Sequence, residues 1–227
     1  MNILLTNDDG YFAIGVKLLK EKLAKYGRVV IVAPKKAMSA KSVSIVLGRA
    51  VEVQKVNEDI FYMDGTPADC VAFGLSSLNI DFDLVVSGCN DGFNVSYDTM
   101  YSGTVGACLQ ALTYRKPAIA VSCQGNFAIV GDYFDLVMEH ILNNKLLSTE
   151  YLLNVNFPLG SAVKQIVNTS IYYRPEVTYY YEQNPGHYYA TRDIHDEECP
   201  EENTDVYAVH HGQVSITKLS KTFEYRR

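Results

Sequence analysis

The segment that decides the fold is NILLTNDDGYFAIG, residues 2–15, at the start of the chain. Residues 3–5 are apolar, as in a strand buried on both faces, and they lead directly into Asn7, Asp8 and Asp9. Adjacent carboxylates repel each other and are costly to remove from water without a partner. A bound divalent cation would offset that repulsion, whereas the plain alternative is that the two acids form a solvated turn or cap the next helix.

The composition is that of an ordinary globular protein. The chain has 227 residues, of which 48% are hydrophobic and 20% charged, and its formal net charge is -6. That length suits one large domain, or one domain with an appendage. No apolar run reaches the ~18–20 residues of a membrane span, and no signal-like segment opens the chain. We therefore expect a cytoplasmic protein that binds neither nucleic acid nor membrane.

The cysteines and histidines restrict the available chemistry. The cysteines are odd in number and form no CxxC pair, which favours reduced core thiols over disulfides or zinc: Cys70, Cys89, Cys108, Cys123 and Cys199. All five histidines lie beyond residue 139. A mechanism built on the earlier motifs must therefore use carboxylates, hydroxyls, amides or a metal ion.

Short apolar runs alternate with helix-period segments through residue ~145, which predicts a parallel α/β sheet covered on both faces. The expected strands are 2–6, 28–34, 83–88, 117–122 and 152–158, with extended segments at 43–47, 50–56 and 60–63. The expected helices are 13–26, 66–78, 104–114 and 128–144, the first with Ile14, Leu18, Leu19 and Leu23 on its apolar side. The organisation predicted is a core over 1–160 and a β-rich extension over 161–227.

The extension is expected to form an arm. It holds a tyrosine-rich polar segment at 172–204, followed by two β runs at 205–212 and 213–219, the last returning to the core. The tyrosines have two interpretations. They could stack on a substrate base, or they could cover a β arm that packs against a partner subunit.

Three polar loops each follow an apolar strand, and the carboxyl ends of parallel strands meet at one sheet edge, where ligands bind. The first carries Asp8 and Asp9, the second carries Ser39, and the third carries Asn90 and Asn94. Such an oxygen-rich cluster suits a hard divalent cation that keeps several waters, such as magnesium or manganese.

The next feature is YSGTVGA, residues 101–107, where Ser102, Gly103 and Thr104 begin a helix. Free N–H groups at a helix start, beside small residues, favour a phosphate, although an ordinary Ser/Thr cap is the plain alternative. A metal site beside an anion site, without histidine, suggests metal-assisted hydrolysis of a phosphate ester.

Seven motifs in order resemble the SurE family of survival-protein nucleotidases: ILLTNDDG, VAP…S, GTPADCV, DLVVSGCNDGFN, YSGTVGA, PAIAVS and LNVNFP. GQVSITKL resembles that family's closing strand. The resemblance implies a Rossmann-like three-layer core and a metal-dependent 5′-nucleotidase. Its substrates would be nucleoside 5′-monophosphates, with 3′-monophosphates as further candidates. It also implies a homodimer or homotetramer with exchanged or interlocked C-terminal arms.

The resemblance also implies roles for single residues. One divalent cation per subunit would be held by Asp8, Asp9, Ser39 and Asn90, with Asp8, Asp9 and Asn94 as catalytic residues. Ser102, Gly103 and Thr104 would bind the substrate phosphate. The chain departs from the family at two positions, because Ser42 and Ser96 stand where the family often has glycine.

Other interpretations remain open at this point. A receiver-like signalling domain also places paired acids after its first strand to bind magnesium. A haloacid-type phosphatase needs D-x-D, whereas these acids are adjacent. Within the nucleotidase hypothesis, water could attack phosphorus directly, or an aspartyl-phosphate could form first.

Overall fold

The computed structural model describes residues 1–173, 177–193 and 201–220. Its strands are β1 (Asn2–Thr6), β2 (Arg28–Pro34), β3 (Val53–Asn57), β4 (Ile60–Met63), β5 (Leu84–Asp91), β6 (Ala118–Cys123), β7 (Tyr151–Asn156), β8 (Gln165–Thr169), β9 (Val177–Asn184), β10 (His187–Asp193) and β11 (Gln213–Ser220). Its helices are α1 (Ile14–Leu23), α2 (Pro67–Ser77), α3 (Asp98–Tyr101), α4 (Gly103–Thr113), α5 (Phe127–Asn143) and α6 (Asp205–His210).

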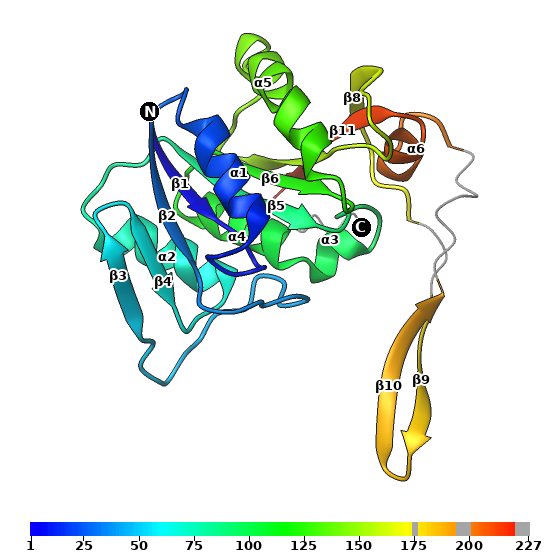
Figure 1. Cartoon of the computed structure of the whole chain (residues 1–227), viewed down its shortest axis with the longest axis horizontal. Coiled ribbons are helices and arrows are strands. Elements are labelled where there is room, and N and C mark those ends of the chain that lie inside the picture. The colour runs from blue at the N-terminus through cyan, green and yellow to red at the C-terminus, as the bar shows by residue number, and fades with distance from the viewer. Residues whose placement is uncertain (174–176, 194–200, 221–227) are drawn as a thin grey trace, which may run out of the picture.

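The central sheet has nine strands in the order β3-β4-β2-β1-β5-β6-β7-β11-β8. The six neighbours from β4 to β7 are parallel, whereas β3 is antiparallel to β4 and β11 is antiparallel to β7. The mostly parallel α/β sheet predicted from the sequence is confirmed (Figure 1). Strand β1 lies between β2 and β5, so its carboxyl end is flanked by the loops that follow those strands.

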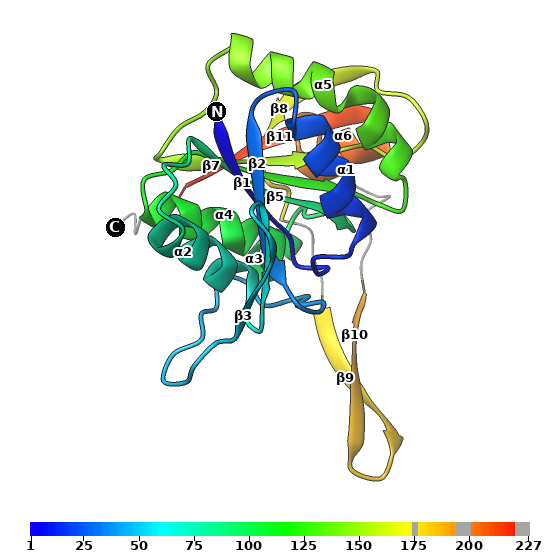
Figure 2. The ribbon, with the colours of Figure 1, turned by 60° about the vertical axis from the view of Figure 1, so that its left-hand side comes forward.

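Helices cover both faces of this sheet, and β1 shows why. Ile3 and Leu5 pack in one core with Leu19 of α1 and Phe134 of α5, whereas Leu4 faces the other core, with residues of α2 and α4. Alternate residues of a strand point to opposite faces, so an unbroken apolar run requires cover on both sides. Figures 1 and 2 show the two helical layers with the sheet between them.

The expected strand at 43–47 is wrong, because this segment is a loop outside the sheet. Its backbone is bound by other elements. The Ser42 amide donates to Tyr101 O at 2.9 Å, the Ser44 carbonyl accepts from Thr66 Oγ1 at 2.6 Å, and the Val46 amide donates to Asp69 Oδ1 at 3.0 Å. Those bonds satisfy backbone groups that would otherwise pair with a neighbouring strand. This explains why a segment rich in β-branched residues stays out of the sheet.

The expected strand at 205–212 is also wrong, because α6 occupies most of it. Thr204 caps this helix by accepting from the Tyr207 amide at 3.4 Å, and Val206 and Val209 recur at helical spacing in a small buried cluster.

The apolar side expected for the first helix is correct except at Ile14, which is 67% exposed. Helix α3 and strand β8 were not predicted.

The β-rich extension contains a hairpin. Strands β9 and β10 pair antiparallel and extend away from the layered sheet in both views (Figures 1 and 2). Five of its tyrosines are at least half exposed: Tyr179, Tyr180, Tyr181, Tyr188 and Tyr189. Strands β8 and β11, which flank the hairpin in sequence, belong to the main sheet.

Two further expectations concern the cysteines and membrane-spanning helices. Cys70, Cys89, Cys108 and Cys123 are buried free thiols, whereas Cys199 lies outside the described residues. Within those residues, no helix combines the length and hydrophobicity that a membrane crossing requires.

Candidate active site

The three polar loops meet at the carboxyl edge of the sheet, as the sequence predicted. A pocket of about 280 Å³ is lined by six of the eight predicted site residues, together with acidic, aromatic and basic neighbours. The six are Asp8, Asp9, Ser39, Asn90, Asn94 and Ser102. The other two, Gly103 and Thr104, are buried directly behind the pocket at the start of α4.

Asp8 is the most buried carboxylate of the pocket, with 4% of its surface exposed. Its Oδ1 accepts a hydrogen bond from Thr104 Oγ1 at 2.6 Å, and its carbonyl accepts from the Met38 amide at 2.6 Å. Burial raises the pKa of Asp8 to about 6; the Thr104 bond lowers this pKa and the neighbouring Asp9 raises it. The site thus holds an acid that titrates near neutrality.

Gly103 allows α4 to approach Asp8 closely. A Cβ at this position would lie 2.9 Å from Asp8 Cβ and 3.0 Å from Asp8 Oδ2, closer than side chains normally pack. Ser102 caps the helix by accepting from the Val105 amide at 3.1 Å, and its own amide donates to Asp98 O at 3.0 Å. The α4 start is therefore fixed against the end of β1.

Asp9 is half-buried and lies beside a carboxylate that the sequence analysis did not select. Burial is the main cause that raises the pKa of Asp9; a hydrogen bond with the Asp91 backbone lowers this pKa, and the charge of the Asp91 carboxylate raises it. Asp91 lines the pocket and accepts from the Gly125 amide at 2.8 Å. Its position next to Asn90 was the signal that could have identified it.

The two asparagines are held by their amide nitrogens. Asn90 Nδ2 donates to Gly92 O at 2.8 Å, and Asn94 Nδ2 donates to Ser122 Oγ at 2.8 Å. The Asn94 backbone is fixed in turn by Asn154 and Asn156, whose side chains bond to it at 2.7–3.1 Å. This use of the nitrogens leaves the Oδ1 atoms as the groups that each asparagine can offer to a ligand.

The donor set fits a hard divalent cation. Two carboxylates with raised pKa values share the pocket with the oxygens of Ser39 and Asn90, and a cation would stabilise their ionised forms. In the described part of the chain, no group of three or more His, Cys, Asp and Glu side chains is arranged to bind a metal. With the residues expected from the sequence, a cation here would take two carboxylates plus neutral oxygens.

The two departures from the family pattern have a backbone explanation. Ser42 has φ 50° and Ser96 has φ 52°, both in the left-handed region that favours glycine. The chain keeps the glycine-type conformation at both positions with serine in place.

Further residues line the pocket without having been predicted. They are Ala40, Asp91, Phe93, Asp98, Tyr101 and Arg192. Arg192 comes from the base of the hairpin, and its Nη1 lies 2.5 Å from Asp98 Oδ1. Sequence spacing gave no signal for it, because 90 residues or more separate it from every other residue of the pocket.

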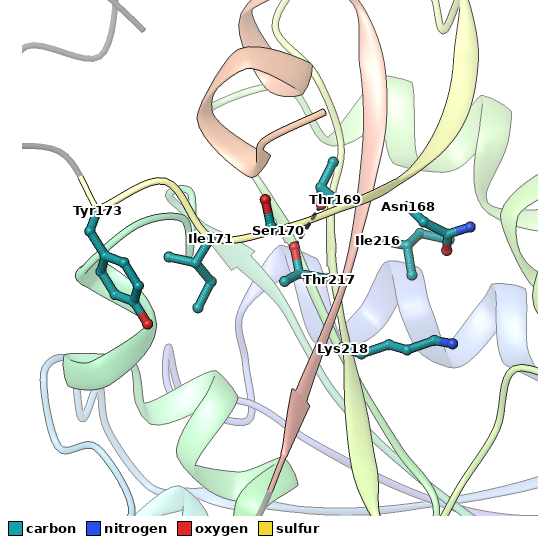
Figure 3. Close-up of a pocket in the computed structure, with 8 residues that line it drawn as sticks. All are labelled: Asn168, Thr169, Ser170, Ile171, Tyr173, Ile216, Thr217 and Lys218. Carbon is teal, nitrogen blue, oxygen red and sulfur yellow. Dashed lines mark hydrogen bonds between the residues drawn. The ribbon is translucent and has the colours of Figure 1, made fainter. Parts of the chain in front are cut away.

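A larger cavity, of about 620 Å³, lies elsewhere, over β8 and β11 (Figure 3). Its hydroxyls bond to one another, with Thr169 Oγ1 2.7 Å from Thr217 Oγ1, and Lys218 is its one ionisable side chain apart from Tyr173 among the described residues. It offers no paired acids, so the smaller pocket is the better candidate for catalysis.

Comparisons with known proteins identify relatives of the whole chain. The sequence profile of the family described as "Survival protein SurE" matches residues 3–178. A 5′-nucleotidase SurE from Acinetobacter baylyi is 40% identical over 175 residues, which cover 72% of this chain and 68% of that protein. One from Clostridium botulinum is 34% identical, covering 98% of this chain and 94% of that protein.

A solved structure gives the same result for the fold. The crystal structure of the SurE protein from Aquifex aeolicus superposes with a TM-score of 0.83 and 33% sequence identity, covering 99% of this chain and 95% of that one. The sheet order, the pocket at the carboxyl edge and these matches lead to one conclusion: the chain belongs to the SurE family.

Proposed function

We propose that this protein is a 5′-nucleotidase that hydrolyses nucleoside 5′-monophosphates, with 3′-monophosphates as further candidates, using one divalent cation per subunit. The observation that carries the proposal is the hydrogen bond from Thr104 to Asp8, which places the paired acids against the start of α4. The relatives named 5′-nucleotidase support the substrate class. Family membership favours this activity over the receiver-like alternative.

The proposed roles follow from the geometry. Asp8, Asp9, Ser39 and Asn90 would hold a magnesium or manganese ion, which when bound polarises a phosphate oxygen. The start of α4, at Ser102, Gly103 and Thr104, would bind the remaining phosphate oxygens together with Asn94.

Protons are handled by the carboxylates. With a cation bound, Asp8 and Asp9 would both be ionised at neutral pH, and we assign Asp8 the role of orienting or deprotonating the attacking water. Thr104 donates to Asp8, so we assign it a second role, which is to hold Asp8 ionised and in position.

The organisation of the chain is part of the proposal. Residues 1–160 would form the catalytic core, and residues 161–227 a β-rich extension whose hairpin contacts a partner subunit in a cytoplasmic homodimer or homotetramer. The exposed tyrosines of β9 and β10 support this, since an isolated hairpin is marginally stable in water. Sedimentation of the intact chain and of a deletion of 177–193 would test it, and an unchanged oligomer after the deletion would refute the arm.

Phosphate release from a panel of nucleoside 5′- and 3′-monophosphates, with and without a chelator, tests the proposed activity. We expect turnover with magnesium or manganese and none after exhaustive chelation. Full activity in the chelated protein would refute the metal role. Turnover confined to substrates other than nucleotides would refute the substrate class. An inactive Asp8→Ala variant is the matched control for contaminating phosphatases.

A further inference from the structure

The proposed site contains a cation supplied by the hairpin. Arg192 is the next-to-last residue of β10, and its side chain lines the same pocket as Asp8, Asn94 and Ser102. About a third of this side chain is exposed, and its guanidinium lies within ion-pair distance of Asp98 in the core. The guanidinium thus lies against the core while the rest of the hairpin extends away from it.

Arg192 is bound to the element that leads into the phosphate-binding turn. Its Nη1 lies 2.5 Å from Oδ1 of Asp98, the first residue of α3. The carbonyl of Asp98 accepts from the Ser102 amide at 3.0 Å. A single residue therefore connects the guanidinium to the start of α4.

The charge of the pocket makes this cation significant. Among the described lining residues, four are carboxylates, namely Asp8, Asp9, Asp91 and Asp98, and Arg192 is the one cation. A divalent cation would offset two of the four negative charges, and a phosphate dianion would then enter a pocket that is still acidic. The planar guanidinium of arginine matches the geometry of phosphate oxygens, which makes this side chain suited to binding a phosphoryl group.

We propose that Arg192 is a substrate-binding residue, whose guanidinium binds the phosphoryl group at the mouth of the pocket. The inference rests on the proposed function for the identity of the substrate. It assigns to the hairpin a contribution to the site within the same chain, in addition to any contact with a partner. The alternative is that Arg192 only tethers the hairpin to α3 through Asp98.

Two variants distinguish phosphate binding from tethering, because both break the ion pair between Arg192 and Asp98. Arg192→Gln removes the cation, whereas Asp98→Asn keeps the cation and removes a pocket carboxylate. If Arg192 binds phosphate, Arg192→Gln should weaken phosphate binding about tenfold or more, as expected for a lost charged hydrogen bond, and Asp98→Asn should strengthen it. A tether would make both variants behave alike.

The measurement is calorimetric binding of inorganic phosphate to the full chain in saturating magnesium, with magnesium affinity measured separately. Arg49→Gln is the matched control, since Arg49 pairs with Asp64 at 3.5 Å on the surface outside the pocket. In steady-state kinetics, Arg192→Gln should raise KM for the nucleotide more than it lowers kcat.

The proposal is overturned if Arg192→Gln and Asp98→Asn weaken phosphate binding equally, if Arg192→Gln changes nothing, or if the wild-type protein binds no phosphate. Phosphate binding does not depend on nucleotide turnover. A wild-type protein that binds phosphate through Arg192 but hydrolyses no nucleotide would count against the proposed function alone.

Discussion

The hydroxyl of Thr104 donates to Oδ1 of Asp8 at 2.6 Å, between two residues that are 96 positions apart in the chain. This bond joins the loop after β1 to the first turn of α4, and it is buried. A threonine that the sequence suggested for phosphate therefore also controls the protonation of the carboxylate proposed to bind metal.

Replacing Thr104 with valine should raise the pKa of Asp8 above its value of about 6, because the ionised form loses a hydrogen bond. A hydrogen bond to a charged group contributes about 1.5–3 kcal/mol, so the shift should be about one to two pH units. Magnesium binding measured against pH should move to higher pH by that amount. Thr104→Ser keeps the donor and should restore the wild-type profile; identical profiles for both variants would contradict the role.

The contribution of Asp8 to the stability of the metal-free protein should fall as pH rises from about 4 to about 6. The pKa of Asp8 is raised by burial, so between its ordinary value and about 6 the folded state binds more protons than the unfolded state. The free energy of unfolding therefore falls with rising pH across this window, by up to about 3 kcal/mol. Asp8→Asn should remove that slope and be more stable than wild type at pH 7 without metal. Urea unfolding at pH 4 and pH 7 measures this, and equal slopes for the two proteins would refute it.

Gly103→Ala should damage the site, because the added Cβ would lie 2.9 Å from Asp8 Cβ. We expect a loss of about 1–3 kcal/mol of stability and weaker magnesium binding, since Asp8 or α4 must shift. Gly131→Ala is the matched control in α5, where the nearest atom to a new Cβ is Leu18 Cδ1 at 3.8 Å. That change should stabilise the helix by about 0.5–1 kcal/mol. Thermal unfolding distinguishes the two, and a neutral Gly103→Ala would contradict the close packing.

Ser42→Gly should stabilise the protein, because Ser42 has φ 50° and a left-handed residue other than glycine costs about 1–2 kcal/mol. Part of that gain is lost to the greater freedom of glycine in the unfolded chain, so the net increase should be about 0.5–1 kcal/mol. Ser44→Gly, at a position without a positive φ, should instead destabilise. Chemical denaturation tests the pair, and a loss of stability in Ser42→Gly would show that the backbone strain has been misjudged.

Much of this architecture could be predicted from the sequence because each signal was local. The apolar run at 3–5, the helix start at Thr66 and the polar residues after β1, β2 and β5 carry their own structural meaning. A parallel sheet then forces those loops to one edge. The convergence of the site followed from topology without knowledge of any side-chain contact.

The errors had two kinds of cause. Residues 43–47 have strand composition, but Thr66 and Asp69, which are distant in sequence, bind their backbone and keep them out of the sheet. At 205–210 the helix signal was local, namely the Thr204 cap and the helical spacing of Val206 and Val209, and the strand prediction overlooked it. Arg192 could not be assigned to the pocket, because only the path of the hairpin brings it there.

The loop between β2 and β3 carries Ser39, and bonds to α2 and to Tyr101 hold its backbone from Ser42 onward. The conformational entropy of this loop is therefore lost when the protein folds and is not lost again when a ligand arrives. Binding to a preorganised site avoids that ordering cost, so we expect the affinity of the proposed site to depend in part on the α2 N-terminus, which lies outside the pocket. Substitutions that weaken the α2 N-terminus would act on binding at a distance, through the freedom that they return to this loop.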